Sequence, residues 1–130
     1  MHRSPVAAAL GMEVVEADEQ RTTLRVVVRD DMLNGFGITH GGMVFTLADE
    51  TFAIACNTTP DSQMVAQQCE IDYLRPTTVG EVLVATATTI HQGRSASIHD
   101  VVVTAHETFD APGRPIAHFR GRSRTMLPRP

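Results

Sequence analysis

Hydrophobic and polar positions alternate with different periods along the chain, and the changes of period separate the expected elements. The segment 4–11, SPVAAALG, predicts a short helix, because Ser-Pro is a good helix start and glycine a good helix end. Residues 12–18 and 21–29 alternate apolar and polar side chains on either side of a polar turn, which is typical of a β-hairpin. Residues 30–39 contain two glycines and an Asn-Gly pair, and they predict a loop.

One long helix is predicted from Gly41 to Asn57, GGMVFTLADETFAIACN, with Asn57 as its C-terminal cap. The stretch is apolar nearly all round, so we expect it to be buried on most sides. Asp49 and Glu50 interrupt this character, and Glu50 points about 100° away from Asp49 and reaches solvent more easily. The stripe that contains Asp49 also holds Gly42, Phe45, Thr46, Phe52, Ala53 and Cys56.

Strand-like runs fill the rest of the chain. They cover 64–74, 81–92, 95–107 and 114–126, and turn signals at 75–80, 92–93 and 111–113 separate them. Strands that surround a single apolar helix indicate an α+β fold, in which a long antiparallel β-sheet is wrapped around a central α-helix.

Length and charge narrow the possible functions. The 130 residues, 42% of them hydrophobic, are enough for one domain with one core, spanning 1–130. The formal charge of −4 provides no basic surplus for nucleic acid or an anionic membrane. No apolar stretch approaches the ~20 residues of a membrane-spanning helix. The N-terminal apolar run is too short for a signal peptide, so we expect a cytoplasmic protein.

Three residue types limit the chemistry further. All eleven basic residues are arginine, which excludes Schiff-base chemistry on lysine and a P-loop lysine; a GC-rich genome explains this usage as well as function does. Cys56 and Cys69 lack CxxC spacing and are expected to be buried, reduced thiols. No metal is expected, because metal-ligand spacing is absent among the histidines His91, His99, His106 and His118.

Polar residues around the start of the long helix form the candidate site. His40-Gly41-Gly42 opens the helix with N–H groups that no side chain shields, and the helix dipole favours an oxyanion there. Either a ligand carbonyl approaches Gly41 and Gly42, with His40 and Asn34 orienting it, or the segment is an ordinary glycine-rich turn capped by His40. Asp49 has two interpretations as well, a packing role or a chemical one.

A distance argument predicts a homodimer with shared sites. Asp49 lies eight residues after Gly41, which is about 12 Å along a helix axis. Groups that act on one carbonyl must lie within about 3–3.5 Å of the reacting atoms. Two antiparallel copies of the helix, related by a two-fold axis, bring Gly41 of one copy beside Asp49 of the other.

Several segments carry a resemblance to a known family. They are Asn34-Gly35, His40-Gly41-Gly42, LADETFAIACN, IDYLRP (71–76), HQGR (91–94) and HFRGRS (118–123). Together, over residues 10–125, they resemble the hotdog-fold acyl-CoA thioesterases, and within these the hydroxyphenylacetyl-CoA thioesterases of phenylacetic acid degradation. The resemblance implies a hotdog fold assembled as homodimers, and as homotetramers that are dimers of dimers.

Roles for the residues near the helix follow from the same resemblance. Asp49 matches the catalytic carboxylate of the family, and Gly41 matches the backbone N–H that polarises the thioester carbonyl. His40 and Asn34 match residues that position the thioester or the attacking water. A related branch uses Glu with a Thr four residues later, so Asp49 and Ala53 place this chain outside that branch.

Substrate binding by arginine is also implied. Basic residues on later strands and loops meet the CoA phosphates in the family, and Arg94 and Arg120 or Arg122 fall where such residues lie. Relatives often have lysine at such places, and arginine keeps the charge with a different geometry.

The expected reaction is hydrolysis of an acyl-CoA to a free acid and CoA, with no metal or redox cofactor. Asp49 of the partner subunit either deprotonates water, which we prefer, or attacks the carbonyl to form an anhydride. The acyl group is expected to be (hydroxy)phenylacetyl or a similar aryl or medium-chain group. Two alternatives stay open, an enoyl-thioester hydratase or dehydratase and a non-catalytic acyl-CoA-binding protein. An apolar acyl pocket or the core is expected to hold Met43, Phe36, Phe45 and Phe52.

Overall fold

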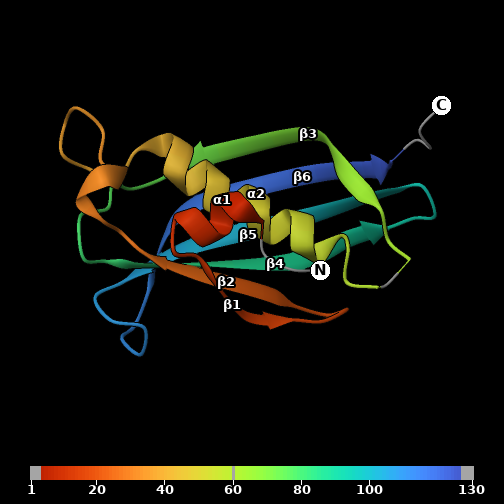
Figure 1. Cartoon of the computed structure of the whole chain (residues 1–130), viewed down its shortest axis with the longest axis horizontal. Coiled ribbons are helices and arrows are strands. Elements are labelled where there is room, and N and C mark those ends of the chain that lie inside the picture. Colours follow the sequence, from red (N-terminus) through yellow and green to blue (C-terminus); the bar gives the residue numbers. More distant parts are fainter. Residues whose placement is uncertain (1–3, 60, 127–130) are drawn as a thin grey trace.

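The computed structural model describes residues 4–59 and 61–126 (Figure 1). The elements are α1 (Pro5–Ala9), β1 (Glu13–Ala17), β2 (Thr22–Val27), the 3₁₀ turn η1 (Asp30–Met32), α2 (Gly41–Ala55), β3 (Met64–Tyr73), β4 (Val82–Gln92), β5 (Ala96–His106) and β6 (Arg114–Thr125). Each predicted helix and strand is present, and η1 lies within the predicted loop. The residues before Ser4, which belong to the N-terminal segment considered for a signal peptide, lie outside the described residues.

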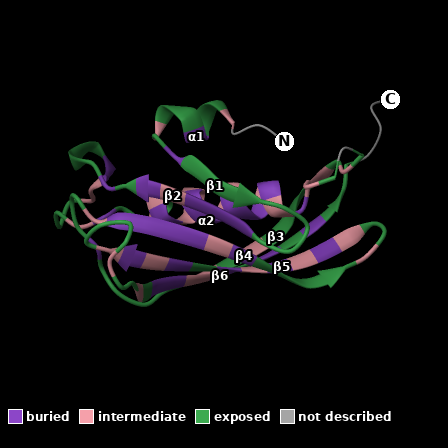
Figure 2. Cartoon of the chain, turned by 90° about the horizontal axis from the view of Figure 1, so that it is seen from below, coloured by how far each residue is buried: buried purple, intermediate pink, exposed green. Residues whose placement is uncertain are grey.

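All six strands form one antiparallel sheet in the order β1-β2-β4-β5-β6-β3. Figure 2 shows α2 on one face of this sheet, with α1 beyond it. The predicted α+β fold with a central helix against an antiparallel sheet is therefore confirmed. β3 is an edge strand of ten residues, and most of its side chains are exposed.

The core lies between α2 and the inner face of the sheet, because α2 packs on β2, β3, β4, β5 and β6. Aromatic rings fill its centre: Phe52 packs on Phe119 at 5.7 Å between centroids, and Phe45 on Phe119 at 5.5 Å. Gly121 of β6 leaves room for Phe52, because a Cβ there would lie 2.7 Å from that ring. Buried side chains of α2 are Val44, Leu47, Ala48, Thr51, Phe52 and Ile54.

One face of α2 is not covered, which corrects the expectation of a helix buried on most sides. Gly42 is exposed, and Thr46, Asp49 and Ala53 are only partly buried. These four residues turn away from the sheet, whereas Phe45, Phe52 and Cys56, which were predicted on the same stripe, pack into or against the core. An apolar helix pattern therefore does not distinguish the face that packs on the sheet from a second face, which a single chain leaves partly open to solvent.

The C-terminal end of α2 also differs from the prediction, since the helix ends at Ala55 with Cys56 as its cap. Asn57 lies just beyond and closes the turn with its side chain. Its amide nitrogen donates to the carbonyl oxygens of Ala53 and Met64, at 2.8 and 3.0 Å, and its oxygen accepts from the Met64 N–H at 2.8 Å. Asn57 thus joins the end of the helix to the start of β3.

Ser4 and Glu50 fasten α1 to α2. The Ser4 hydroxyl donates to Glu50 Oε1 at 2.9 Å and accepts from the Ala7 N–H, and the Ser4 N–H donates to Glu50 Oε2. Glu50 is therefore a structural carboxylate. Within residues 4–59 and 61–126, no helix is long and apolar enough to cross a membrane.

Candidate functional site

The start of α2 presents an open backbone donor. The His40 N–H donates to the Met32 carbonyl at 2.8 Å, and His40 Nδ1 accepts from the Gly42 N–H at 2.9 Å. His40 therefore caps the helix, as one of the two interpretations of this segment expected. The N–H of Gly41 has no acceptor in the described part of the chain, and the helix dipole adds positive potential at this position.

Tyr73, the last residue of β3, holds the other side of Gly41. Its hydroxyl donates to the Gly41 carbonyl at 3.0 Å. Its ring leaves little space for a side chain, since a Cβ at position 41 would lie 3.3 Å from the ring carbon and the oxygen. Glycine lets the ring and any ligand come close to the same peptide.

A cavity of about 380 Å³ opens at this helix end. Its apolar wall comes from the loop before α2, from α2 itself, from the segment between β3 and β4, and from β6. Its lining residues are Asn34, Ile38, Thr39, Gly41, Val44, Tyr73, Leu74, Arg75, Pro76, Thr77 and Ile116. An apolar cleft with a few polar groups at one end is the usual form of a small-molecule site.

Asn34 lies in this cavity wall, and its oxygen is already engaged. That oxygen accepts from the N–H groups of Phe36 and Ile38, at 2.9 and 3.3 Å, and so shapes the loop before the helix. The side-chain nitrogen is the part of Asn34 that remains for a ligand. Asn34 and Gly41 are thus brought together, as predicted.

Asp49 lies two turns further along α2 and does not line the cavity. Its carboxylate has no hydrogen bond or ion pair within residues 4–59 and 61–126. Burial raises the pKa of Asp49 above its ordinary value, and the neighbouring charge of Glu50 adds to this. A packing role for Asp49 would require a hydrogen-bond partner such as Ser4, which bonds to Glu50, and the described residues provide none for Asp49.

None of the predicted arginines lines the cavity. Arg120 and Arg122 flank Gly121 on β6, so their side chains point to the sheet face opposite α2. Arg120 is paired with Asp100 at 2.6 Å. Arg94 lies in the turn between β4 and β5, and neither it nor Arg122 forms an ion pair in the described part of the chain.

The structure decides the open question about the apolar side chains. Phe52 is buried in the core, Phe45 and Met43 pack against it, and Phe36 is 91% exposed. None of these side chains lines the cavity, so of the two alternatives the core is the one confirmed for Phe52, Phe45 and Met43, and the exposed Phe36 fits neither.

The two cysteines and the four histidines on the later strands do not line this cavity. Burial raises the pKa of the Cys56 thiol to about 11, and Cys69 is only partly buried. His99 is buried against Phe52 at 5.8 Å between ring centroids. His106 lies 2.8 Å from Thr104 Oγ1, His118 pairs with Asp100, and His91 is exposed.

Sequence reasoning missed Tyr73, Arg75 and Thr77 as parts of the site. The signal was present, because Tyr73 and Arg75 belong to the IDYLRP segment quoted for the family resemblance. Only the fold shows that this segment returns to the start of α2, more than 30 positions earlier in the chain.

Comparisons with known proteins identify the family of this chain. The family model of the thioesterase superfamily matches residues 36–108. Acyl-coenzyme A thioesterase PaaI of Escherichia coli is 38% identical over 117 residues, which are 90% of this chain and 79% of that protein.

Solved structures give the same result. The structure of the E. coli PaaI protein superposes with a TM-score of 0.87 at 36% identity, over 95% of this chain and 86% of the other. A Streptococcus pneumoniae hypothetical thioesterase, solved with coenzyme A, superposes with a TM-score of 0.80 at 25% identity, over 88% and 85%. A central helix packed against an antiparallel sheet, with these structural matches, defines a hotdog-fold protein. The chain belongs to the thioesterase superfamily.

Proposed function

We propose that this thioesterase hydrolyses an acyl-CoA thioester to a carboxylic acid and CoA. The main support is the Gly41 N–H, which lacks an acceptor in the described residues and lies in the wall of an apolar cavity at a helix N-terminus. Such a donor stabilises the oxyanion formed when a carbonyl is attacked, and losing one donor costs about 10²–10³ in rate. Two relatives, an acyl-coenzyme A thioesterase and a hypothetical thioesterase solved with coenzyme A, favour CoA esters.

The carboxylate that completes the site comes from a second copy of the chain. Eight residues of helix separate Gly41 from Asp49, about 12 Å along the axis, so one chain does not direct both at one carbonyl. An unpartnered, half-buried Asp49 on the uncovered face of α2 fits this role. The ten-residue edge strand β3 lies beside that face and offers unpaired backbone groups to an antiparallel copy. The proposed unit is a homodimer with two shared sites, and a homotetramer built from two such dimers.

The chemistry is a single displacement by water in our preferred route. Asp49 of the partner subunit takes a proton from a water, whose oxygen attacks the thioester carbon while the Gly41 N–H binds the carbonyl oxygen. The C–S bond then breaks, and the thiolate leaves and takes up a proton. The raised pKa of Asp49 makes its carboxylate a stronger base. In the alternative route Asp49 attacks first, and water then hydrolyses the anhydride.

The acyl group that we propose is (hydroxy)phenylacetyl or a similar aryl or medium-chain group, which suits an apolar cavity of about 380 Å³. Arg94 and Arg122 are the better candidates for the CoA phosphates, since Asp100 already holds Arg120.

Hydrolysis by a carboxylate and a backbone N–H needs no metal or redox cofactor. We place the protein in the cytoplasm, where the free thiols of Cys56 and Cys69 stay reduced.

Thiol release from phenylacetyl-CoA and hexanoyl-CoA tests the reaction. Wild type is expected to release CoA from at least one of them, and Asp49→Asn to lose about 10³-fold in kcat while it still binds. Glu50→Gln is the matched control, because it removes the adjacent carboxylate, which fastens α1 and makes only the smaller contribution to the raised pKa of Asp49, and we expect its kcat to stay far above that of Asp49→Asn. Wild type that binds both esters without hydrolysis would support the acyl-CoA-binding alternative, and hydration of an enoyl-CoA would support the hydratase.

Mixing two inactive variants tests the shared site. Gly41→Pro removes the N–H at a helix position that accepts proline, and Asp49→Asn removes the carboxylate. In a mixed dimer one site keeps both groups, so an equal mixture recovers about a quarter of the wild-type rate. An equal mixture that stays inactive, although the chains exchange, would show that each chain carries a whole site.

A further inference from the structure

The wall of the cavity opposite α2 is a segment, residues 74–78, that follows the end of β3. The N–H groups of Leu74 and Arg75 donate to the Ile116 carbonyl of β6, at 2.8 and 3.3 Å, and two further fastenings hold the rest of the segment. Thr77 bonds to Thr39 twice: the Thr39 N–H donates to the Thr77 carbonyl at 2.9 Å, and the Thr77 hydroxyl donates to the Thr39 hydroxyl at 2.6 Å. Thr39 and Thr77 are both buried. Since Thr39 directly precedes His40 and Gly41, the segment is joined to the start of α2.

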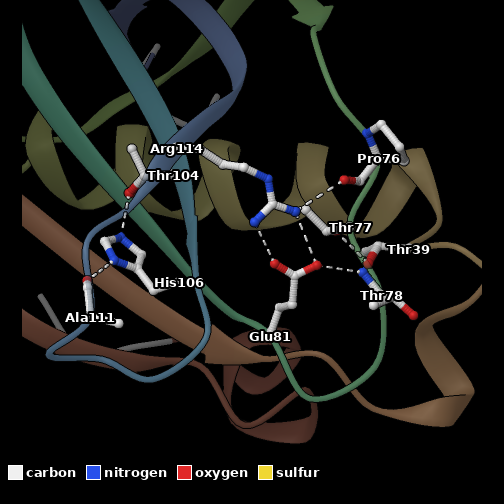
Figure 3. Close-up of polar contacts among 9 residues, drawn as sticks. All are labelled: Thr39, Pro76, Thr77, Thr78, Glu81, Thr104, His106, Ala111 and Arg114. Carbon is white, nitrogen blue, oxygen red and sulfur yellow. Dashed lines mark hydrogen bonds and ion pairs between the residues drawn. The ribbon is translucent and has the colours of Figure 1, made fainter.

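The second fastening is the ion pair between Glu81 and Arg114 (Figure 3). Arg114 on β6 contacts both carboxylate oxygens, at 2.7 and 3.1 Å, and also donates to the Pro76 carbonyl at 3.4 Å. Glu81 Oε1 accepts from the Thr78 N–H at 3.0 Å. The guanidinium holds the pKa of Glu81 below its ordinary value, so the pair is charged at neutral pH.

We propose that Arg114 and Glu81 are positioning residues, which hold the segment 74–78 against Thr39 and so fix the direction of the Gly41 N–H. The inference rests on the proposed function, because it concerns the donor that binds the oxyanion. Neither side chain lines the cavity, and both act through backbone groups of the segment.

The bonding pattern distinguishes this role from ordinary surface stabilisation. A partly exposed ion pair contributes little to stability by itself. Arg25 and Glu13 form another partly exposed pair between β1 and β2, a single contact at 3.3 Å in which Glu13 is 61% exposed against 15% for Glu81, and Arg25 also lies over the Phe109 ring. Only the Arg114 pair carries bonds to a cavity wall, so only its loss is expected to reach the chemistry.

The test compares Arg114→Gln and Thr77→Val with the control Arg25→Gln. In both test variants kcat is expected to fall about tenfold with KM within about threefold, because a displaced donor weakens the transition state more than the bound ester. The double variant loses less than the product of the single losses, since both act on one segment. Arg114→Lys recovers only part of the rate, because an ammonium lacks the planar fork.

A charge-swapped pair, Glu81→Arg with Arg114→Glu, distinguishes the electrostatic attraction between the two side chains from their hydrogen bonds to the segment 74–78. It restores the ion pair, but it places a donor beside the Thr78 N–H and an acceptor beside the Pro76 carbonyl. We therefore expect its thermal midpoint to recover without recovery of kcat. Recovery of kcat in the swap, or a loss in Arg114→Gln no larger than in Arg25→Gln, would overturn the proposal.

Amide exchange provides a readout that does not depend on turnover. The Thr39 N–H, which donates to Thr77, is expected to exchange about tenfold faster in Arg114→Gln and at the wild-type rate in Arg25→Gln. Equal exchange in both variants contradicts the inference. A wild type without thiol release would instead contradict the proposed function, and the exchange result would still stand.

Discussion

The two ends of α2 are built for different purposes. At the C-terminal end Asn57 satisfies the backbone of the helix end and of β3 with three side-chain hydrogen bonds, and Phe52 packs into the space above Gly121. At the N-terminal end the Gly41 N–H has no acceptor among the described residues, and a cavity lies in front of it. One end is closed and stabilises the fold, while the other keeps a group available for a ligand. Substitutions at the two ends should therefore separate activity from stability.

The largest effect is expected from the open end. Gly41→Pro deletes the N–H, and the extended backbone of His40, with φ −62° and ψ 134°, is compatible with a following proline. Gly41→Ala is the matched control, because it brings the same close contact with Tyr73 and keeps the N–H. In steady-state assays kcat of the proline variant is expected to be about 10²–10³ below that of the alanine variant. Equal rates would exclude the Gly41 N–H as the oxyanion donor.

A smaller effect, on stability alone, is expected at the closed end. Asn57→Ala leaves the Met64 N–H and two carbonyls without their partner and should lower the free energy of unfolding by about 2–3 kcal/mol. Asn57→Asp keeps the acceptor for Met64 and should cost less. Urea unfolding gives the stability, and kcat per folded molecule should stay at the wild-type value. A drop in kcat as large as in Gly41→Pro would remove the contrast between the two ends.

The smallest expected effect is a pH dependence of stability caused by His99, which packs on Phe52 near the C-terminal end of α2. Burial lowers the pKa of His99, so below pH 6.5 the unfolded chain binds a proton more readily than the folded one. Stability is then fully present above about pH 6.5 and is lost as the pH falls. Urea midpoints at about pH 7.5 and about pH 5.5 should differ more in wild type than in His99→Gln. His91→Gln, at an exposed position, is the control, and an equal difference in all three proteins contradicts the assignment.

The elements could be predicted from the sequence because periodicity and turn residues are local signals. The helix from Gly41 and the strands that follow it are confirmed almost to the residue. The end of α2 was predicted two residues too late, because the Asn57 side chain bonds to Met64, seven positions away, rather than extending the helix. The uncovered face of α2 could not be found from an apolar pattern, which does not say whether the sheet or another surface covers each side.

Only part of the candidate site could be predicted, because sequence patterns are local signals and the site joins distant segments. Asn34, His40 and Gly41 are close in sequence to the start of the helix, and the loop brings them together there. Tyr73 reaches Gly41 only because β3 returns along the helix, and the fastening by Glu81 and Arg114 joins positions 33 residues apart. The roles of Asp49, His40 and the arginines stay predictions. The phenylalanines were ambiguous because a core and a pocket require the same side chains.

The contact between Tyr73 and Gly41 also makes the cavity visible by spectroscopy. The chain contains one tyrosine and no tryptophan, so Tyr73 is its only strong intrinsic fluorophore. Its hydroxyl is bonded to the same peptide region that a ligand carbonyl approaches, and its ring forms part of the cavity wall. The emission of the unlabelled protein therefore reports on this cavity, and a non-absorbing thioester analogue can be titrated without a dye or a second reporter.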